Sequence, residues 1–166
     1  MRGLNKTPSI KEKKMALHLY RLLSGAQTLV AATAKTILQL VTPATRLAMI
    51  RTLELGFASV TATDAPVLVQ LFIQTTAGTM SALTPVAIDQ TIPASLCTGC
   101  QKTATAEPTT TTELWSQQVT PVGGTAVFVF PKDEQIKMAV STKVGLVCTS
   151  PATQTANVRA VLTFEE

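Results

Sequence analysis

The side chains that could carry chemistry in this chain begin with its three cysteines. Cys97 and Cys100 form a C-T-G-C motif, and Cys148 lies far from it in the sequence. A C-x-x-C motif is half of a zinc site, but no second pair exists and the only histidine, His18, is distant. The sequence therefore predicts no metal site and unpaired thiols. A disulfide within the motif or to Cys148 is the alternative.

The remaining titratable residues do not form a recognisable catalytic motif. His18 lies near the N-terminus, which argues against a Ser-His-Asp or Cys-His arrangement. Asp64, Asp89 and Asp133 each lie in or beside a turn signal, where aspartate commonly bonds its own backbone. An active site needs several titratable groups brought together. We therefore predict that the protein is not an enzyme, and that it binds no cofactor and no small-molecule substrate.

The residues that give the chain its net charge of +4 lie at the N-terminus. Within residues 1–14, five basic residues accompany a single acidic one, Glu12, and the rest of the chain is balanced. The five are Arg2, Lys6, Lys11, Lys13 and Lys14. Such a segment is either a flexible, solvated leader or an arm that contacts an acidic neighbour, such as another subunit or nucleic acid. Because the balanced remainder predicts no basic face, we expect no direct readout of nucleic acid.

The apolar region that follows this arm is a poor match both to a signal peptide and to a transmembrane helix. Residues 11–14 and the later Ala32-Thr33-Ala34 have the outline of a signal peptide. His18, Arg21 and Gln27 interrupt the apolar region between them, so secretion is the weaker alternative. No run approaches 18 uninterrupted apolar residues. We therefore expect no transmembrane helix and no membrane contact.

Composition and periodicity predict an all-β fold. Threonine, which suits pleated and half-buried surfaces, occurs 28 times, whereas charged residues make up 14% of the chain. Residues 46–57 alternate apolar and polar side chains, with Arg51 as the one break on the apolar parity, and residues 67–73 are apolar on both faces. These patterns indicate two long strands, separated by a turn at Thr63-Asp64-Ala65-Pro66. Two such strands need a second sheet to be stable in water.

Shorter apolar segments, bounded by glycine, proline and polar turn residues, predict the other strands. They span about residues 17–23, 28–34, 35–41, 113–119, 126–130, 135–140, 144–148 and 157–164. The segments at 135–140 and 144–148 predict a hairpin, and residues 83–90 an edge strand or extended loop. We predict an antiparallel β-sandwich with a jelly-roll-like arrangement, formed as one domain by residues 15–166.

Two features of this domain, besides the basic arm, are candidates for contact with a partner. Residues 91–112 contain two prolines, a glycine and a run of threonines, which predicts a long loop. Loops of this length are usually functional or mobile. Trp115, the only tryptophan, predicts either a buried core residue or an interface anchor.

Seven short motifs follow one another along residues 33–166. They are T-A-K-T-I-L-Q-L-V at 33–41, the strand ending in Gly56-Phe57, P-V-L-V-Q-L at 66–71, Q-T-T-A-G-T at 74–79, A-E-P-T at 106–109, P-V-G-G at 121–124 and the final N-V-R-A-V-L-T-F-E-E. In these motifs the chain resembles small β-sandwich virion proteins of tailed bacteriophages, in particular head decoration, or cement, proteins. The resemblance covers about residues 15–166, and its motifs are structural.

The resemblance implies a protein on the outside of an icosahedral shell, typically a trimer at three-fold and quasi-three-fold positions that clamps neighbouring capsomers. The implied partners are the major capsid protein and further copies of this chain. The implied location is the outer capsid surface of the virion, after synthesis in the host cytoplasm. The resemblance transfers no single binding residue, so the arm 1–14 and the loop 91–112 are our candidate contacts.

Two alternatives to a decoration protein remain open at this stage. The first is a self-assembling coat protein, or a tail or spike subunit, with the same sandwich. The second is a secreted adhesin or carbohydrate-binding module. Sugar binding usually relies on exposed aromatic side chains, and a chain with one tryptophan and one tyrosine has few to offer.

Overall fold

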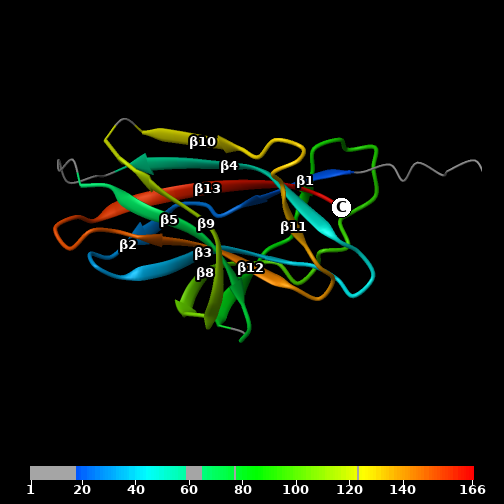
Figure 1. The fold of residues 1–166 in the computed structure, drawn as a ribbon, viewed down its shortest axis with the longest axis horizontal. Helices are drawn as coiled ribbons and strands as arrows, with labels where there is room; N and C mark the ends of the chain where they lie inside the picture. The colour runs from blue at the N-terminus through cyan, green and yellow to red at the C-terminus, as the bar shows by residue number, and fades with distance from the viewer. Residues whose placement is uncertain (1–17, 59–64, 77, 123) are drawn as a thin grey trace, which may run out of the picture.

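A computed structural model describes residues 18–58, 65–76, 78–122 and 124–166 (Figure 1). These residues form thirteen β-strands and no helix, which confirms the predicted all-β class. The strands form two sheets, and every pairing between named strands is antiparallel. The predicted β-sandwich is therefore confirmed. The arm over residues 1–14 and the turn residue Asp64 lie outside the described residues.

The first sheet has the strand order β10-β4-β13-β1-β7, with β11 paired to β4 and β2 paired to β13. Its strands are β1 (Leu19–Leu23), β2 (Gln27–Leu29), β4 (Ala48–Ala58), β7 (Val86–Ala87), β10 (Thr125–Val129), β11 (Ile136–Met138) and β13 (Ala156–Glu165). The second sheet has the order β6-β8-β3-β12-β5-β9. Its strands are β3 (Ala34–Val41), β5 (Val67–Gln74), β6 (Thr79–Ala82), β8 (Gln101–Ala106), β9 (Thr110–Val119) and β12 (Lys143–Thr149).

The core lies between the two sheets and consists of the inward-facing aliphatic side chains of their long central strands. In β13, for example, Val158, Ala160 and Leu162 are buried, whereas Arg159 between them is exposed. This period of two is the reason that alternating sequences form half-buried strands. Each large aliphatic side chain that is fully buried contributes roughly 1.5–3 kcal/mol to stability. One connected cluster of such side chains spans both sheets.

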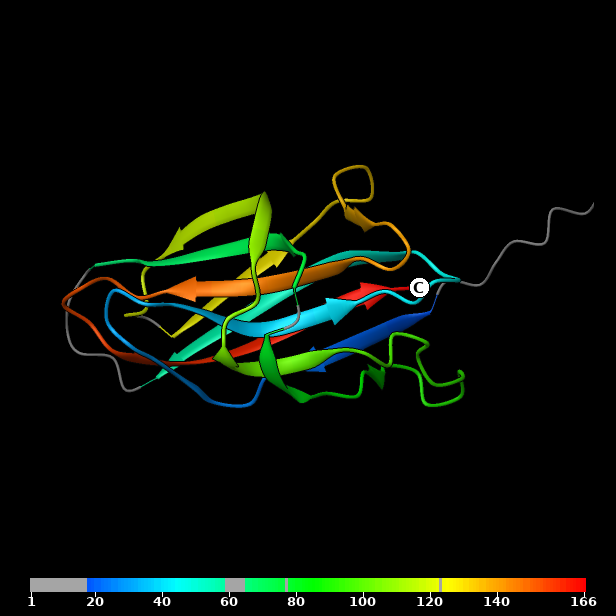
Figure 2. The same cartoon turned by 90° about the horizontal axis from the view of Figure 1, so that it is seen from below.

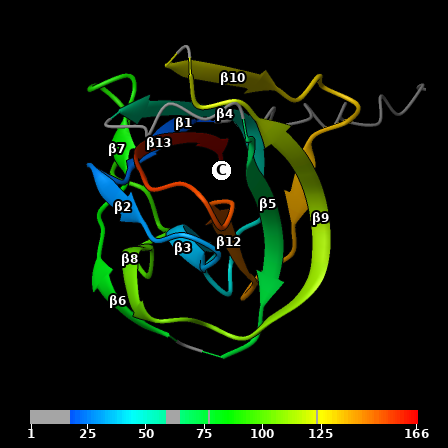
Figure 3. The same cartoon turned by 90° about the vertical axis from the view of Figure 1, so that its left-hand side faces the viewer.

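A short segment covers the outer face of the second sheet. Residues 107–109, which we call the strap, connect β8 to β9, although β3, β12 and β5 lie between these two strands in the sheet. Figures 2 and 3 show β8 and β9 curling away from the sheet, with the strap passing over β3 and β12. The Glu107 carboxylate accepts a hydrogen bond of 2.8 Å from the backbone N–H of Thr36, which fixes the strap to β3.

Under the strap, three polar side chains of the second sheet are buried and bonded to one another. Gln39 donates to the amide oxygen of Gln74 over 2.6 Å, and Gln74 donates to the Thr36 hydroxyl over 3.2 Å. A Cβ atom at Gly145 would overlap the Gln74 amide, so a larger residue at this position would force that amide to move. The network satisfies polar groups that burial would otherwise leave without partners.

Two predictions about connections are wrong. Residues 91–112 are not one long loop, because they contain β8 and the start of β9, and the irregular connection before β8 covers residues 88–100. β8 has few large apolar residues, and it pairs with β3 at only two positions, so little in its side chains marks it as a strand. The hairpin over 135–148 is also wrong, since β11 pairs with β4 in the first sheet and β12 lies between β3 and β5 in the second.

The described residues contain no helix of the length and apolar character needed to cross a membrane.

Candidate functional site

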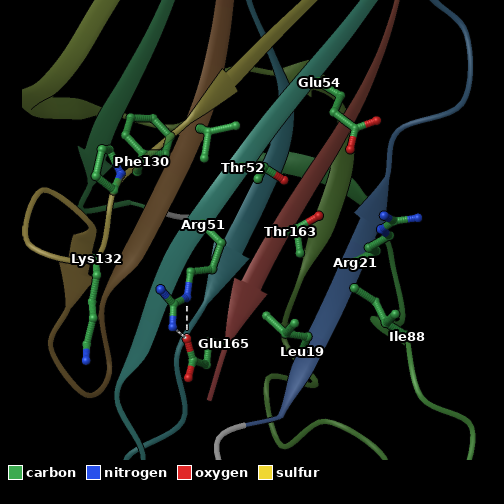
Figure 4. Close-up of a pocket in the computed structure, with 12 residues that line it drawn as sticks. Leu19, Arg21, Arg51, Thr52, Glu54, Ile88, Phe130, Lys132, Thr163 and Glu165 are labelled. Atoms are coloured by element: carbon green, nitrogen blue, oxygen red, sulfur yellow. Dashed lines mark hydrogen bonds and ion pairs between the residues drawn. The ribbon is translucent and has the colours of Figure 1, made fainter.

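A groove with a volume of about 600 Å³ lies on the outer face of the first sheet, the face turned away from the second sheet (Figure 4). β4 and β13 form its floor, β1 and Ile88 form one wall, and residues 129–132 form the other. The lining residues are Leu19, Arg21, Arg51, Thr52, Glu54, Ile88, Val129, Phe130, Pro131, Lys132, Thr163 and Glu165.

The register of the strands places outward side chains in rows that cross the first sheet. The central row consists of Val129, Thr52, Thr163, Arg21 and Val86, each opposite the next on the neighbouring strand. A parallel row consists of Val127, Glu54, Val161 and Leu23. Residues opposite one another point to the same face of a sheet, so both rows have an apolar residue at each end. The interior of the central row is polar or charged, and that of the second row holds Glu54 beside Val161.

Arg51 and Glu165 form an ion pair on the floor of the groove, drawn with dashed lines in Figure 4. Thr52 lies opposite Thr163 and Ile50 lies opposite Phe164, so Arg51 is an extra residue that forms a β-bulge in β4. The carbonyl of Arg51 accepts a hydrogen bond of 2.9 Å from the N–H of Phe130, outside the regular ladder. A bulge turns a side chain from its regular direction, and here it allows Arg51 to reach Glu165.

The ion pair is largely shielded from water on its acidic side. The Glu165 side chain is only 5% exposed, whereas that of Arg51 is 29% exposed. A carboxylate in such a place needs a partner, because an unpaired buried charge costs several kcal/mol. Arg51 supplies this partner through two nitrogen atoms, Nε and Nη2.

The Thr163 hydroxyl is a buried polar group in the groove that has no hydrogen-bond partner among the described residues. Thr163 is 5% exposed and lies in the central row beside Arg21. A buried hydroxyl without a partner costs about 1–3 kcal/mol, and such groups are uncommon in native proteins. A ligand or partner group that approached this hydroxyl would recover that cost.

Three further charges line the groove without an ion pair to another described residue. Arg21 and Lys132 are exposed and lie on opposite walls, and Glu54 is half-buried at one end (Figure 4). With the Arg51 and Glu165 pair included, the lining holds three basic and two acidic side chains. The side chains that line the groove therefore have a net positive charge.

Exposed apolar side chains border the groove and continue beyond it. Leu19, Ile88 and Val129 line the walls, and Val129 is 67% exposed. Leu23, Val86 and Val127 are also exposed. They lie at the ends of the two rows, on the same face. Apolar side chains that gather on one face, with polar groups among them, are typical of surfaces that bind other proteins.

Trp115 lies on β9, outside the groove, where it links the edges of the two sheets. Its ring is edge-on to Phe128, with centroids 4.8 Å apart, and to Phe130, with centroids 5.8 Å apart. The side chain is half-buried and packs against the core. Because Phe130 itself lines the groove, Trp115 supports one wall of the groove from behind.

All three cysteines are free thiols and buried. Burial raises the pKa of the Cys100 thiol to about 11 and that of Cys148 to about 12, and it also raises the pKa of Cys97. Thiols in this condition stay protonated at neutral pH and are poor nucleophiles and metal ligands. In the part of the chain that the structure describes, no group of three or more metal-ligating side chains comes together.

The C-T-G-C motif anchors the connection before β8 to the end of β13. Glu166 accepts hydrogen bonds from the backbone N–H of Leu96 over 2.8 Å, from the Ser95 hydroxyl over 3.1 Å and from the Cys97 thiol over 3.0 Å. The Tyr20 hydroxyl donates to the carbonyl of Pro93 over 2.9 Å. These bonds hold the connection against β1 and β13, beside the wall that contains Ile88.

The groove residues were not among the candidates from the sequence. Arg51 gave a signal, since it breaks the apolar alternation of its strand, and the structure explains this break by the bulge. Thr163 and Glu165 gave none, because an outward position on β13 is ordinary for polar residues. Of the predicted candidates, the structure brings Cys97 and Cys100 together in the connection before β8 and places Cys148 apart from them, on β12 of the second sheet.

No protein-family model matches this sequence, and a search of curated proteins finds no match either. The fold and the groove define the class of the protein. It is a two-sheet antiparallel β-sandwich that carries a groove with apolar walls and unpaired positive charge on one outer face.

Proposed function

We propose that this protein is a structural virion protein that binds the outside of an assembled phage capsid and stabilises it by clamping neighbouring capsomers. The observation that carries the proposal is the groove face of the first sheet. Six of its aliphatic side chains are between 40% and 67% exposed: Leu19, Leu23, Val86, Ile88, Val127 and Val129. Burying this face against a partner would remove apolar surface from water, which is favourable by about 25 cal/mol per Å². The resemblance of the chain's seven motifs to those of phage decoration proteins favours the same class.

A decoration protein works by binding the assembled lattice in preference to its dissociated subunits. Any such binding stabilises the lattice by mass action. Each copy needs only a modest interface, because many copies act together on one shell. The groove face suits this role, since it combines exposed apolar side chains with an arginine-containing ion pair, and arginine and apolar side chains are common in protein interfaces.

The proposed partners are the major capsid protein and two further copies of this chain, in a trimer on the outer capsid surface. Light scattering of the purified protein at several concentrations tests the oligomer. A stable trimer supports the proposal. A particle of many tens of copies would contradict it and indicate a self-assembling coat protein.

Binding to shells is tested by sedimentation with capsids of the same virus, with dissociated capsid subunits as the control. We expect the protein to sediment with shells and not to bind free subunits. Val127→Asp places a charge on the groove face and should weaken shell binding. Val30→Asp is the matched control, because Val30 is also 58% exposed and lies outside the first sheet's rows. Equal occupancy of both variants would contradict a role for this face.

A further inference from the structure

We propose that the groove binds an extended, acidic segment of the capsid subunit, whose carboxylates are contacted by Arg21 and Lys132. This inference rests on the proposed function and specifies the chemistry of its partner. The groove is open along the outer face of the sheet, and its volume of about 600 Å³ lies within the range of roughly 300–1,000 Å³ that is usual for small-ligand pockets. A short extended segment therefore fits the groove, whereas a folded domain would contact only its rims.

The distribution of charge selects an acidic segment over a basic one. Arg51 is already paired with Glu165, so the cations that remain for a partner are Arg21 on one wall and Lys132 on the other. Glu54 is the one carboxylate of the lining without an ion pair among the described residues. A segment with carboxylates on both sides would meet both cations, and a basic segment would be repelled by both.

The buried Thr163 hydroxyl is the second observation that indicates a partner. It lies opposite Arg21 in the central row and lacks a hydrogen-bond partner within the described residues. A carboxylate or carbonyl oxygen bound beside Arg21 could accept a hydrogen bond from this hydroxyl. One partner group would then satisfy both a free cation and an unpaired buried donor.

The walls and floor favour a peptide over nucleic acid as the acidic partner. The walls present Leu19, Ile88 and Val129, which suit the apolar side chains of a peptide. The floor contains Glu54, and this carboxylate, which has no ion pair among the described residues, repels a continuous phosphate backbone. A peptide can place an uncharged residue over this position.

The inference is tested first by NMR on the full-length protein, without shells. The probe is a synthetic ten-residue peptide in which pairs of glutamates alternate with pairs of threonines, so that the extended chain has carboxylates on both sides. The control peptide replaces each glutamate by lysine. We expect the acidic peptide to shift the backbone amide signals of residues 19–21, 51–54 and 129–132. Shifts confined to the basic residues 1–14, or equal shifts with the lysine peptide, would overturn the inference.

Charge reversal provides the quantitative test. The double variant Arg21→Glu/Lys132→Glu should weaken binding of the acidic peptide by at least about tenfold. The double variant Lys35→Glu/Lys143→Glu is the control, because it changes the net charge equally at two half-buried residues of the second sheet, which do not line the groove. Equal losses in the two double variants would overturn the inference, since they would indicate a general charge effect.

Sedimentation with shells separates failure of this inference from failure of the proposed function. If the unmodified protein does not sediment with shells, the proposed function fails, whatever the peptide does. If it does sediment and the Arg21→Glu/Lys132→Glu variant sediments equally well, the proposed function stands and this inference is overturned. The expected result is sedimentation of the unmodified protein and of the control variant, with loss of the groove variant.

Discussion

Arg51 on β4 and Glu165 on β13 are 114 residues apart in the sequence and form an ion pair on the outer face of the first sheet. The pair depends on the bulge at Arg51, because a regular β4 would send this side chain toward the core. The shift in strand register at this bulge is therefore what places the Arg51 side chain in the groove.

Removing either partner of this pair should have unequal effects on stability. Arg51→Met leaves the nearly buried Glu165 carboxylate without a partner, and we expect a loss of about 2–3 kcal/mol in the free energy of unfolding. Glu165→Gln leaves the more exposed Arg51 unpaired, and we expect a loss of about 1 kcal/mol. Urea denaturation followed by circular dichroism measures both values. Equal losses of stability in the two variants would contradict the prediction, because they would show that the difference in exposure between Arg51 and Glu165 has no effect.

Gly145 should not tolerate a side chain. Gly145→Ala forces the Gln74 amide to move and breaks its bonds to Gln39 and Thr36, so we expect a loss of about 2–3 kcal/mol. Gly56→Ala is the control, because its Cβ would meet only the carbonyl oxygen of Gly124, at an ordinary contact distance of 3.8 Å. The control should change stability by less than about 0.5 kcal/mol. A neutral Gly145→Ala would mean that the amide network can rearrange freely.

Trp115 should contribute to stability as a link between the sheets. Trp115→Ala removes the edge-on contacts with Phe128 and Phe130, and we expect a loss of about 2–3 kcal/mol, less than for a fully buried tryptophan because the side chain is half-buried. Trp115→Phe keeps part of the contact and should cost less. If Trp115→Ala left stability unchanged and reduced only shell binding, Trp115 would act as an interface anchor instead.

The buried thiols should make the protein less stable as the pH rises above about 9. In the unfolded chain the thiols ionise around their ordinary pKa of 9.0, whereas burial raises the pKa to about 11 for Cys100 and about 12 for Cys148. The unfolded state therefore loses protons that the folded state keeps, and the free energy of unfolding falls with pH. Urea denaturation at pH 7, 9 and 10 measures this slope. Cys148→Ala should flatten it, and an unchanged slope would contradict the assignment.

The long strands could be predicted from the sequence, because their alternation reflects burial on one face. The last strand, predicted at 157–164, is found at Ala156–Glu165, and the strand predicted at 67–73 is found at Val67–Gln74. In β4 the predicted inward face is confirmed from Leu53 to Phe57, but it is wrong before the bulge. Leu47 is 63% exposed, whereas Ala48 and Ile50 are buried, since the bulge at Arg51 changes the parity of the residues before it.

The groove and the strand order could not be predicted, because they depend on pairings between distant segments. Nothing in the sequence places β13 between β4 and β1, and only this order brings Arg21, Thr163 and Thr52 into one row. The burial of Gln39 and Gln74 also depends on the strap, whose three residues carry no signal that they cross a sheet.

Hydrogen exchange of the protein, free and bound to shells, tests the central claim that the groove face of the first sheet meets the capsid. The account predicts slower deuterium uptake on binding in residues 86–92 and 129–134, which border the groove. It predicts no change in the strap and β9, on the opposite sheet. Slower uptake in the strap and β9, with residues 86–92 and 129–134 unchanged, would contradict the account and place the capsid on the other face.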